Sequence, residues 1–275
     1  MLSYQHHYHV GNHGDVLKHW VLYEVFCYLQ KKPKPFDYID THAGAGLYQL
    51  NDGKTLKLKE YESGIARLLN NPPNSMSAFC ELMASYTKQG LYPGSSYLAN
   101  SLLRRGDRSW LYELHPATFK ELEQHCPKRR YCFPRNEDGF TGLLGLLPNQ
   151  AKRAVVLIDP SYELKEDYQK VVSIAEKSLQ KMPNTVVLIW YPVVNRQHIE
   201  ELLKAIRHST LNNVLNIELR TTSDGDAKGM TGSGMIVINP PWTLKSIAQE
   251  VLPALSDVLA ADEGAGYDVQ QLVEE

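Results

Sequence analysis

The sequence predicts an α/β fold: a seven-stranded, mostly parallel sheet with an antiparallel last strand, plus a small helical insertion. Seven strand-like segments follow one another, and most are separated by stretches long enough for a helix. The last two lack such a stretch, because the link over residues 223–234 is short and rich in Gly and Asp, so a hairpin is expected there. The segments span residues 36–40, 109–113, 130–134, 154–158, 185–190, 213–219 and 234–239.

Residues 51–90 break this alternation. The segment is polar, carries several lysines and is interrupted by Asn71-Pro72-Pro73-Asn74 before a helical pattern resumes over residues 76–88. We therefore expect a main domain of residues 1–50 and 91–275, with an N-terminal arm that faces the substrate, and an inserted helical subdomain of residues 51–90.

Composition narrows the classes of function. The chain has 275 residues, with 43% hydrophobic and 22% charged residues, which is typical of a globular enzyme. No apolar run approaches the roughly 18 residues of a membrane span, and the first residues resemble no secretory leader. A cytoplasmic protein without a membrane partner is expected, with its four cysteines reduced because none forms a CxxC pair.

The formal net charge of −2 is unusual for a protein that binds nucleic acid, because phosphate contacts depend on Lys and Arg. Local basic clusters would have to supply these contacts, although each cluster could equally be a solvated face. The clusters lie at residues 31–34, 54–59, 104–108 and 128–130.

The first strand leads into Asp40-Thr41-His42-Ala43-Gly44-Ala45-Gly46. Small residues let this backbone turn sharply and lie against a ligand. Dinucleotide-binding loops need a third glycine three residues after the second, and Leu47-Tyr48-Gln49 supplies none. The segment around Gly44 resembles instead the loop with which class I methyltransferases hold S-adenosylmethionine; an ordinary tight turn is the alternative.

The next two strands also end in groups suited to an adenosyl ligand. Glu113 closes the strand 109–113, where a carboxylate could accept both ribose hydroxyls. Asp138 and Gly139 follow the strand 130–134; Asp138 could accept the adenine amino group, and Gly139 permits close approach. By itself Asp-Gly is as compatible with a plain turn.

The fourth strand is a β-branched run, Val155-Val156-Leu157-Ile158, that stops at Asp159-Pro160-Ser161-Tyr162. Ligands of open α/β sheets bind just past the carboxyl ends of the strands, so Asp159 should lie in a cleft. The tetrapeptide resembles the catalytic loop of methyltransferases that act on exocyclic amino groups of nucleic-acid bases. In such a loop the Asp159 carboxylate and the Pro160 carbonyl hold the amino protons, and Tyr162 offers a stacking plane.

A second segment, Asn239-Pro240-Pro241-Trp242, matches the [DNS]PP[YFW] consensus of these enzymes more closely. If residues 234–239 form the antiparallel last strand, however, their carboxyl end lies at the opposite edge of the sheet. We therefore expect Asn239 to be structural.

Histidines and tyrosines crowd into the first twenty residues, ahead of a helix that we expect Asp15 to cap, with Lys18 and His19 in its first turn. No pair has metal-ligand spacing with an acidic or cysteine partner, so no metal is expected. An arm that faces the substrate or cofactor fits better, and a solvated polar arm is the alternative.

Together, the motifs resemble the RlmJ family, adenine-N6 methyltransferases of large-subunit ribosomal RNA. The resemblance runs over nearly the whole chain and is weakest in residues 51–90 and the last twenty. The motifs are Tyr4-Gln5-His6, Gly11 to His19, Asp40 to Gly46, Tyr92-Pro93-Gly94-Ser95, Glu113-Leu114-His115-Pro116 and Gly229 to Met235.

The resemblance implies a class I, Rossmann-like methyltransferase fold, S-adenosylmethionine as methyl donor, and a specific adenine of 23S ribosomal RNA, of the adenine-2030 type, as substrate. The RNA would be protein-free or in an early assembly intermediate, and the enzyme a monomer. Asp159 would be the catalytic acceptor, while Tyr4, His6 and Lys18 would face the RNA or support the reaction. The implied cofactor contacts are His19, His42, Ser95, Glu113, Asp138, Gly139 and Asp159.

One departure concerns the catalytic loop, which in the family reads Asp-Pro-Pro-Tyr, whereas this chain has Ser161 at the third position. Serine removes no acceptor, but it gives up a fixed φ angle and adds an N–H, so we expect a less rigid loop with lower turnover or relaxed substrate choice.

Two alternatives to the ribosomal RNA methyltransferase function remain open. One is a DNA adenine-N6 or small-nucleobase amino methyltransferase; the other is a non-catalytic module that binds nucleic acid, in a family also linked to growth on external DNA.

Overall fold

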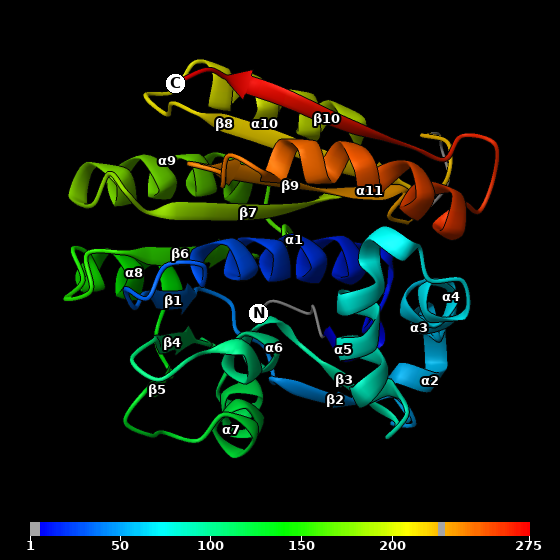
Figure 1. Cartoon of the computed structure of the whole chain (residues 1–275), viewed down its shortest axis with the longest axis horizontal. Helices are drawn as coiled ribbons and strands as arrows, with labels where there is room; N and C mark the ends of the chain where they lie inside the picture. The colour runs from blue at the N-terminus through cyan, green and yellow to red at the C-terminus, as the bar shows by residue number, and fades with distance from the viewer. Residues whose placement is uncertain (1–5, 225–228) are drawn as a thin grey trace.

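The computed structural model describes residues 6–224 and 229–275, and its core is one eight-stranded sheet with helices on both faces (Figure 1). The strands lie in the order β10-β8-β9-β7-β6-β1-β4-β5, with β9 antiparallel to β7 and β8, and β10 antiparallel to β8. Their bounds are β1 Asp37–Asp40, β4 Arg108–Tyr112, β5 Cys132–Arg135, β6 Ala154–Ile158, β7 Val186–Val193, β8 Val214–Arg220, β9 Gly232–Ile238 and β10 Gly266–Val273.

The mostly parallel sheet and the hairpin of β8 and β9 are confirmed, but the number of strands is eight rather than seven. The eighth strand, β10, pairs with β8 at the edge of the sheet. A second, two-stranded sheet was also not predicted; it pairs β2 (Leu47–Gln49) with β3 (Leu91–Pro93).

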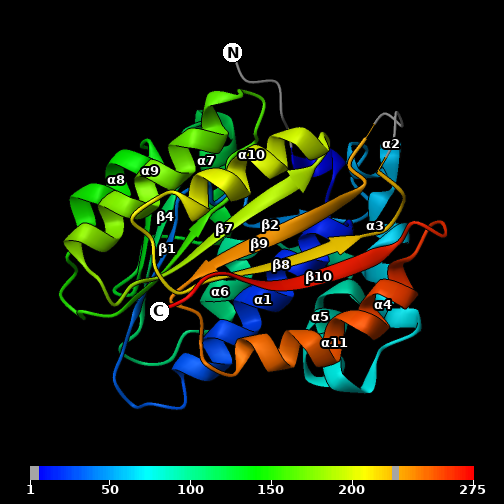
Figure 2. The ribbon, with the colours of Figure 1, turned by 90° about the horizontal axis from the view of Figure 1, so that it is seen from above.

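The two faces of the sheet bury different sets of side chains, because successive residues of a strand point to opposite sides. Val155 and Leu157 of β6 pack in the cluster on the α1 side, whereas Val156 and Ile158 pack in the cluster on the other side. Figure 2 shows the two helix layers on either side of the sheet. One layer holds α8 (Gly139–Leu146), α9 (Glu166–Lys181) and α10 (Arg196–Arg207); the other holds α1 (His13–Leu29), α6 (Ser95–Leu102) and α11 (Leu244–Leu259). Helix α7 (Pro116–His125) precedes β5, and its Leu122 packs in the cluster on the α1 side.

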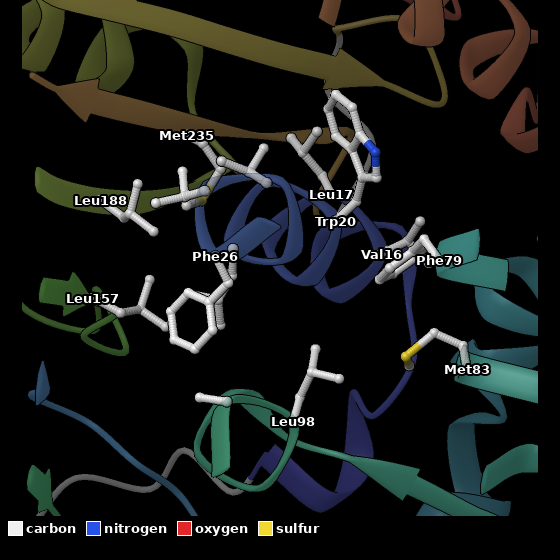
Figure 3. Packing of buried hydrophobic residues seen from close by; sticks show 14 of the residues in the cluster. Val16, Leu17, Trp20, Phe26, Phe79, Met83, Leu98, Leu157, Leu188 and Met235 are labelled. Atoms are coloured by element: carbon white, nitrogen blue, oxygen red, sulfur yellow. The ribbon is translucent and has the colours of Figure 1, made fainter. Parts of the chain in front are cut away.

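Helix α1 is buried on most of its circumference. Figure 3 shows it between side chains of the sheet, such as Leu188 and Met235, and side chains of α5 and α6, such as Phe79 and Leu98. A helix with apolar neighbours on all sides is held firmly, so the polar residues of its first turns are fixed in position.

The N-terminus of α1 differs from our expectation. Its cap is Asn12, whose side chain accepts a hydrogen bond from the Asp15 amide at 3.0 Å, and not Asp15. The helix begins at His13, so Lys18 and His19 lie in its second turn rather than its first. The sequence analysis therefore placed the start of α1 about one turn too late.

Residues 51–90 are helical, as expected, and their helices share the core of α1 rather than forming one of their own. Ile65, Leu68 and Phe79 belong to the same buried cluster as Val16 and Trp20. The division into a main domain (1–50 and 91–275) and an inserted subdomain (51–90) stays a proposal. The helices are α2 (Thr55–Leu58), α3 (Glu60–Ser63), α4 (Ile65–Asn70), the 3-10 turn Asn74–Met76 and α5 (Ser77–Thr87).

Candidate active site

Four neighbouring parallel strands, β6, β1, β4 and β5, bring their carboxyl ends to one edge of the sheet. Asp159 follows β6, the loop with Gly44 follows β1, Glu113 follows β4, and Asp138 follows β5. The four predicted loops therefore lie side by side, in the order catalytic loop, cofactor loop, ribose acid and adenine acid.

Asp40 organises the loop after β1. Its carboxylate is buried and accepts hydrogen bonds from the hydroxyls of Tyr38 and Ser95, both at 2.7 Å, and from the His42 amide at 3.2 Å. Burial raises the pKa of Asp40 to about 6, although the two hydroxyls oppose the shift. Ser95, predicted as a cofactor contact, thus anchors this loop through Asp40.

Gly44 has a left-handed φ of 61°, and a Cβ at this position would lie 2.6 Å from the Tyr48 hydroxyl. Both facts require glycine. The Gly44 amide donates to the Glu113 carboxylate at 3.1 Å, and the His115 amide donates to the same carboxylate at 2.8 Å. Burial raises the pKa of Glu113. Glu113 therefore stands directly against the predicted cofactor loop.

Asp138 caps helix α8 and accepts hydrogen bonds from the Thr141 amide (2.8 Å) and hydroxyl (2.7 Å). Burial would raise the pKa of Asp138, but the bonds from Thr141 hold it below its usual range. Gly139 begins the helix, and a Cβ there would overlap the backbone carbonyl oxygen of Thr41. Close approach of α8 to the loop after β1 explains this glycine.

Two predicted cofactor contacts are neutral histidines. His42 is half-buried, and burial lowers its pKa to about 4. His19 is fully buried, and burial lowers its pKa to about 3; its Nδ1 lies 3.0 Å from the Tyr92 hydroxyl, and its Nε2 has no hydrogen-bond partner in the described part of the chain. Such an orphaned nitrogen at a predicted cofactor contact fits a bound polar ligand.

These residues fit S-adenosylmethionine by their chemistry: a carboxylate at Glu113 for the ribose hydroxyls, an acceptor at Asp138 for the adenine amino group, and a glycine loop at Gly44 for close approach. Each of these assignments remains a proposal. Within the described residues, no group of three or more His, Cys, Asp or Glu side chains is arranged to hold a metal ion. The absence of a metal stays a prediction.

Asp159 forms part of a chain of charged side chains. Its carboxylate accepts a hydrogen bond from Lys18 Nζ at 2.8 Å, and the same Nζ lies 2.9 Å from the Asp15 carboxylate. His6 Nε2 lies 3.0 Å from the other oxygen of Asp15. The structure thus brings together three predicted site residues, Asp159, Lys18 and His6, through Asp15, which we had taken only as a helix cap.

A cavity of about 530 Å³ opens beside this chain of charges. Asp159, Pro160 and Ser161 line part of it, and residues of α3 and of the link before β9 also contribute to its lining. Its volume lies within the usual range of small-molecule and base pockets. The remaining lining residues are His6, His9, Asn12, His13, Asp15, Lys18, Glu60, Ser63, Trp190, Pro192, Val194, Thr221, Gly229 and Met230.

Two predicted residues call for separate comment. Tyr4 lies outside the described residues. Tyr162 does not line the cavity; it has a left-handed φ of 53°, donates its hydroxyl to the Trp190 carbonyl oxygen at 2.6 Å, and packs against Tyr168 with ring centroids 4.6 Å apart. A stacking role for Tyr162 would require a base to reach it beside these contacts, and it stays a prediction.

The structure agrees with our interpretation of Asn239. β9 runs antiparallel to β7, so Asn239 comes at the amino end of β7, and its side-chain amide donates to the carbonyl oxygens of Pro183 (2.8 Å) and Thr185 (2.9 Å). The segment Asn239–Trp242 therefore lies at the sheet edge opposite Asp159.

Sequence reasoning missed three residues at the site. Asp15 joins Lys18 to His6, Trp190 faces Lys18 with the ammonium 5.3 Å from its ring, and His13 lines the cavity. The spacing of Asp15 and Lys18, three residues apart on one helix, was a usable signal for an ion pair. No signal in the sequence could place Trp190.

A Rossmann-like sheet with an antiparallel late strand and these four loops at its carboxyl edge defines a class I methyltransferase, whose methyl donor is S-adenosylmethionine. The family model described as "Ribosomal RNA large subunit methyltransferase D, RlmJ" matches residues 33–273. The chain belongs to this family, and the resemblance seen in the sequence is confirmed.

Individual relatives are similar over nearly their whole length. A Haemophilus influenzae protein named ribosomal RNA large subunit methyltransferase J is 38% identical over 281 residues, covering 100% of both chains. The Escherichia coli protein of the same name is 41% identical over 264 residues, covering 94% of each. A crystal structure from Legionella pneumophila superimposes with a TM-score of 0.85 at 33% identity, covering 95% of this chain and 97% of that one. Within the described residues, no helix is long and apolar enough to cross a membrane.

Proposed function

We propose that this protein transfers a methyl group from S-adenosylmethionine to the exocyclic N6 amino group of a specific adenine in 23S ribosomal RNA. The observation that carries the proposal is the Asp159 loop. It stands at the carboxyl end of β6, next to the cofactor loop after β1, and opens onto a cavity of about 530 Å³. The names of the two curated relatives, which describe ribosomal RNA large subunit methyltransferases, support RNA as the substrate.

The chemistry demands acceptors rather than a strong base. The lone pair of an adenine amino group is delocalised into the ring, so the nitrogen must be held by its two protons and drawn toward tetrahedral geometry before it can attack. In this mechanism the Asp159 carboxylate accepts one amino hydrogen bond and the Pro160 carbonyl oxygen accepts the other. S-adenosylmethionine, when bound, supplies the electrophilic methyl group.

Lys18 and His6 would act around this acceptor pair. Lys18 fixes the direction of the Asp159 carboxylate through the 2.8 Å hydrogen bond, and His6 lines the cavity from the N-terminal arm. Tyr4, immediately before the described part of the arm, would face the RNA. In this proposal Ser161, which also lines the cavity, makes the loop less rigid than a second proline would.

The substrate would be protein-free 23S RNA or an early assembly intermediate, since a base must be unpaired or flipped to enter the cavity. The enzyme would act in the cytoplasm as a monomer.

The experiment that tests this function measures transfer of tritium from labelled S-adenosylmethionine to protein-free 23S RNA, followed by digestion to nucleosides. We expect label in N6-methyladenosine with the wild type, and a loss of at least roughly 100-fold with Asp159→Ala, because an acceptor used in the transition state is removed. A parallel reaction with DNA separates the RNA enzyme from a DNA enzyme. Transfer to DNA but not to RNA, or no transfer alongside intact cofactor binding, would overturn the proposal.

A further inference from the structure

Three ionisable side chains that line the cavity are in direct contact with one another. The Lys18 ammonium stands between the carboxylates of Asp15 (2.9 Å) and Asp159 (2.8 Å). The exposed fractions of the three side chains are 1% for Asp15, 5% for Lys18 and 15% for Asp159. Charges so poorly hydrated interact strongly with one another.

The contact between Lys18 and Asp159 raises a chemical problem. The amino nitrogen that attacks a sulfonium methyl gains positive charge as the new bond forms, and a negative environment stabilises that charge. A lysine at 2.8 Å from Asp159 would cancel the negative charge of the very carboxylate that holds the substrate nitrogen. Lys18 and Asp159 alone would form a neutral pair.

Asp15 removes this difficulty because it adds a second buried negative charge to the same ammonium. We propose that Asp15 is a positioning residue for methyl transfer, whose charge offsets that of Lys18 and keeps the Asp159 site net negative toward the substrate amino nitrogen. This inference rests on the proposed amino methyltransferase function.

The contacts of Asp15 suit it to this role. Besides Lys18, its carboxylate accepts a hydrogen bond from the Gly11 amide at 2.8 Å and meets His6 Nε2 at 3.0 Å, while its own amide is held by the Asn12 side chain. Burial would raise the pKa of Asp15, but His6 and Lys18 hold it well below its usual range. Burial would likewise lower the pKa of Lys18, which the two carboxylates hold well above its usual range. Both groups are therefore charged at neutral pH.

The remaining titratable groups do not supply this charge. His19, on the same helix, is neutral because burial lowers its pKa to about 3. Glu60, across the cavity, is engaged with His9 at 2.9 Å and Asn12 at 2.9 Å. His6 approaches Asp15 from the partly exposed side, and its Nε2 lies within hydrogen-bond distance of the carboxylate, at 3.0 Å.

The N6 lone pair forms the new nitrogen–carbon bond while the methyl–sulfur bond breaks, and its electron pair stays on sulfur. The nitrogen then carries a positive charge until it releases one proton to the Asp159 carboxylate, from which water removes it. Lys18 remains protonated throughout, held by Asp15.

The test compares variants of equal shape that differ in charge: wild type with Asp15→Asn, and Asp15→Glu with Asp15→Gln. At about pH 8, well above the usual range of imidazole titration, we expect kcat to fall roughly 100-fold in Asp15→Asn. Asp15→Glu should keep more activity than Asp15→Gln, with the KM and Kd for S-adenosylmethionine unchanged in each folded variant. Equal kcat values within each pair would overturn the inference.

A second comparison separates charge compensation from support of the fold. In a Lys18→Met background there is no positive charge to offset, so adding Asp15→Asn should cost nothing further or partly restore kcat. The same roughly 100-fold loss in both backgrounds would show a merely structural role. If Asp15→Asn does not fold, the comparison of Asp15→Glu with Asp15→Gln still tests whether the charge at this position matters.

Asp107→Asn is the matched control. Asp107 is equally buried and bound by Arg104 at 3.1 Å, but it lies at the amino end of β4, away from the site. Its loss should lower stability without changing kcat below the melting temperature. Wild type that methylates no nucleic acid would refute the proposed function itself, whereas active wild type with an equally active Asp15→Asn would refute only the role of Asp15.

Discussion

Burial holds three histidines in the neutral form at or beside the site. It lowers the pKa of His13 to about 4, of His19 to about 3 and of His42 to about 4. An imidazole in the unfolded chain titrates near 6.5. Between these values the unfolded state binds protons that the folded state does not, so the free energy of unfolding falls as the pH falls below about 6.5. Asp40 opposes this trend, because a pKa raised to about 6 favours the folded state on acidification.

His19 offers the clearest test, because it is completely buried. We expect acidification from about pH 7 to about pH 5 to cost on the order of 2 kcal/mol of stability through this residue alone. Urea unfolding at the two pH values, in wild type and in His19→Gln, measures the difference. If the variant loses as much stability on acidification as the wild type, His19 is not the source.

Some residues of the site could be predicted from the sequence, and others could not. Asp159, Glu113 and Asp138 were predicted because each lies at or shortly after the end of a predicted strand, and parallel strands deliver their carboxyl ends to one edge. The contact between Lys18 and Asp159 joins residues 141 positions apart, and only the packing of α1 against the sheet creates it. Local patterns also described Asp15 as a cap, because an acid near a helix start fits that role as well as it fits an ion pair.

At the scale of elements, a glycine lets α8 lie close against the loop that follows β1. A Cβ on Gly139 would overlap the Thr41 carbonyl oxygen, whereas a Cβ on Gly145 of the same helix would meet nothing within 4 Å. Gly139→Ala must therefore push α8 away from the loop, and we expect at least about tenfold weaker binding of S-adenosylmethionine together with a loss of roughly 2 kcal/mol of stability.

Gly145→Ala is the control for this prediction. It adds the same methyl group to the same helix without a clash, so it should leave binding unchanged and raise stability by up to about 1 kcal/mol, since alanine favours helix over glycine. Calorimetric titration and thermal melting of both variants check the pair. Similar binding by the two variants would contradict the close approach of α8.

The strands that were not predicted, β2, β3 and β10, were missed for physical reasons. β10 lies at the sheet edge, and none of its eight residues is fully buried, so Asp268, Gln270 and Gln271 interrupt its apolar pattern. β2 and β3 span three residues each, too few for a period of two to show. The most readily found strands, β6, β7 and β9, are buried along most of their length, so their apolar residues run on with few interruptions.

At the scale of the whole molecule, strand direction decides which of two similar tetrapeptides can act. Asp159 and Asn239 both follow apolar strands and both precede proline, but β6 is parallel to β7 and β9 is antiparallel to it. Ile158 pairs with Ile189 near the carboxyl half of β7, whereas Ile238 pairs with Val187 near its amino end. The closer match to the consensus therefore lies at the wrong edge of the sheet for the cofactor loop.

This topology makes a prediction about Asn239. Its φ of 55° is left-handed, a conformation that asparagine tolerates, and its side chain ties the end of β9 to Pro183 and Thr185. Asn239→Ala should lower the free energy of unfolding by about 2 kcal/mol, because it loses hydrogen bonds and strains the backbone. Asn239→Gly loses the same hydrogen bonds with less strain, so it should be less destabilising. Neither change should alter kcat on RNA, in contrast to Asp159→Ala. Denaturant unfolding and the tritium assay, run side by side, check this prediction. An Asn239→Gly variant that folded normally yet lost methyl transfer would contradict it, because catalysis would then depend on the edge of the sheet opposite Asp159.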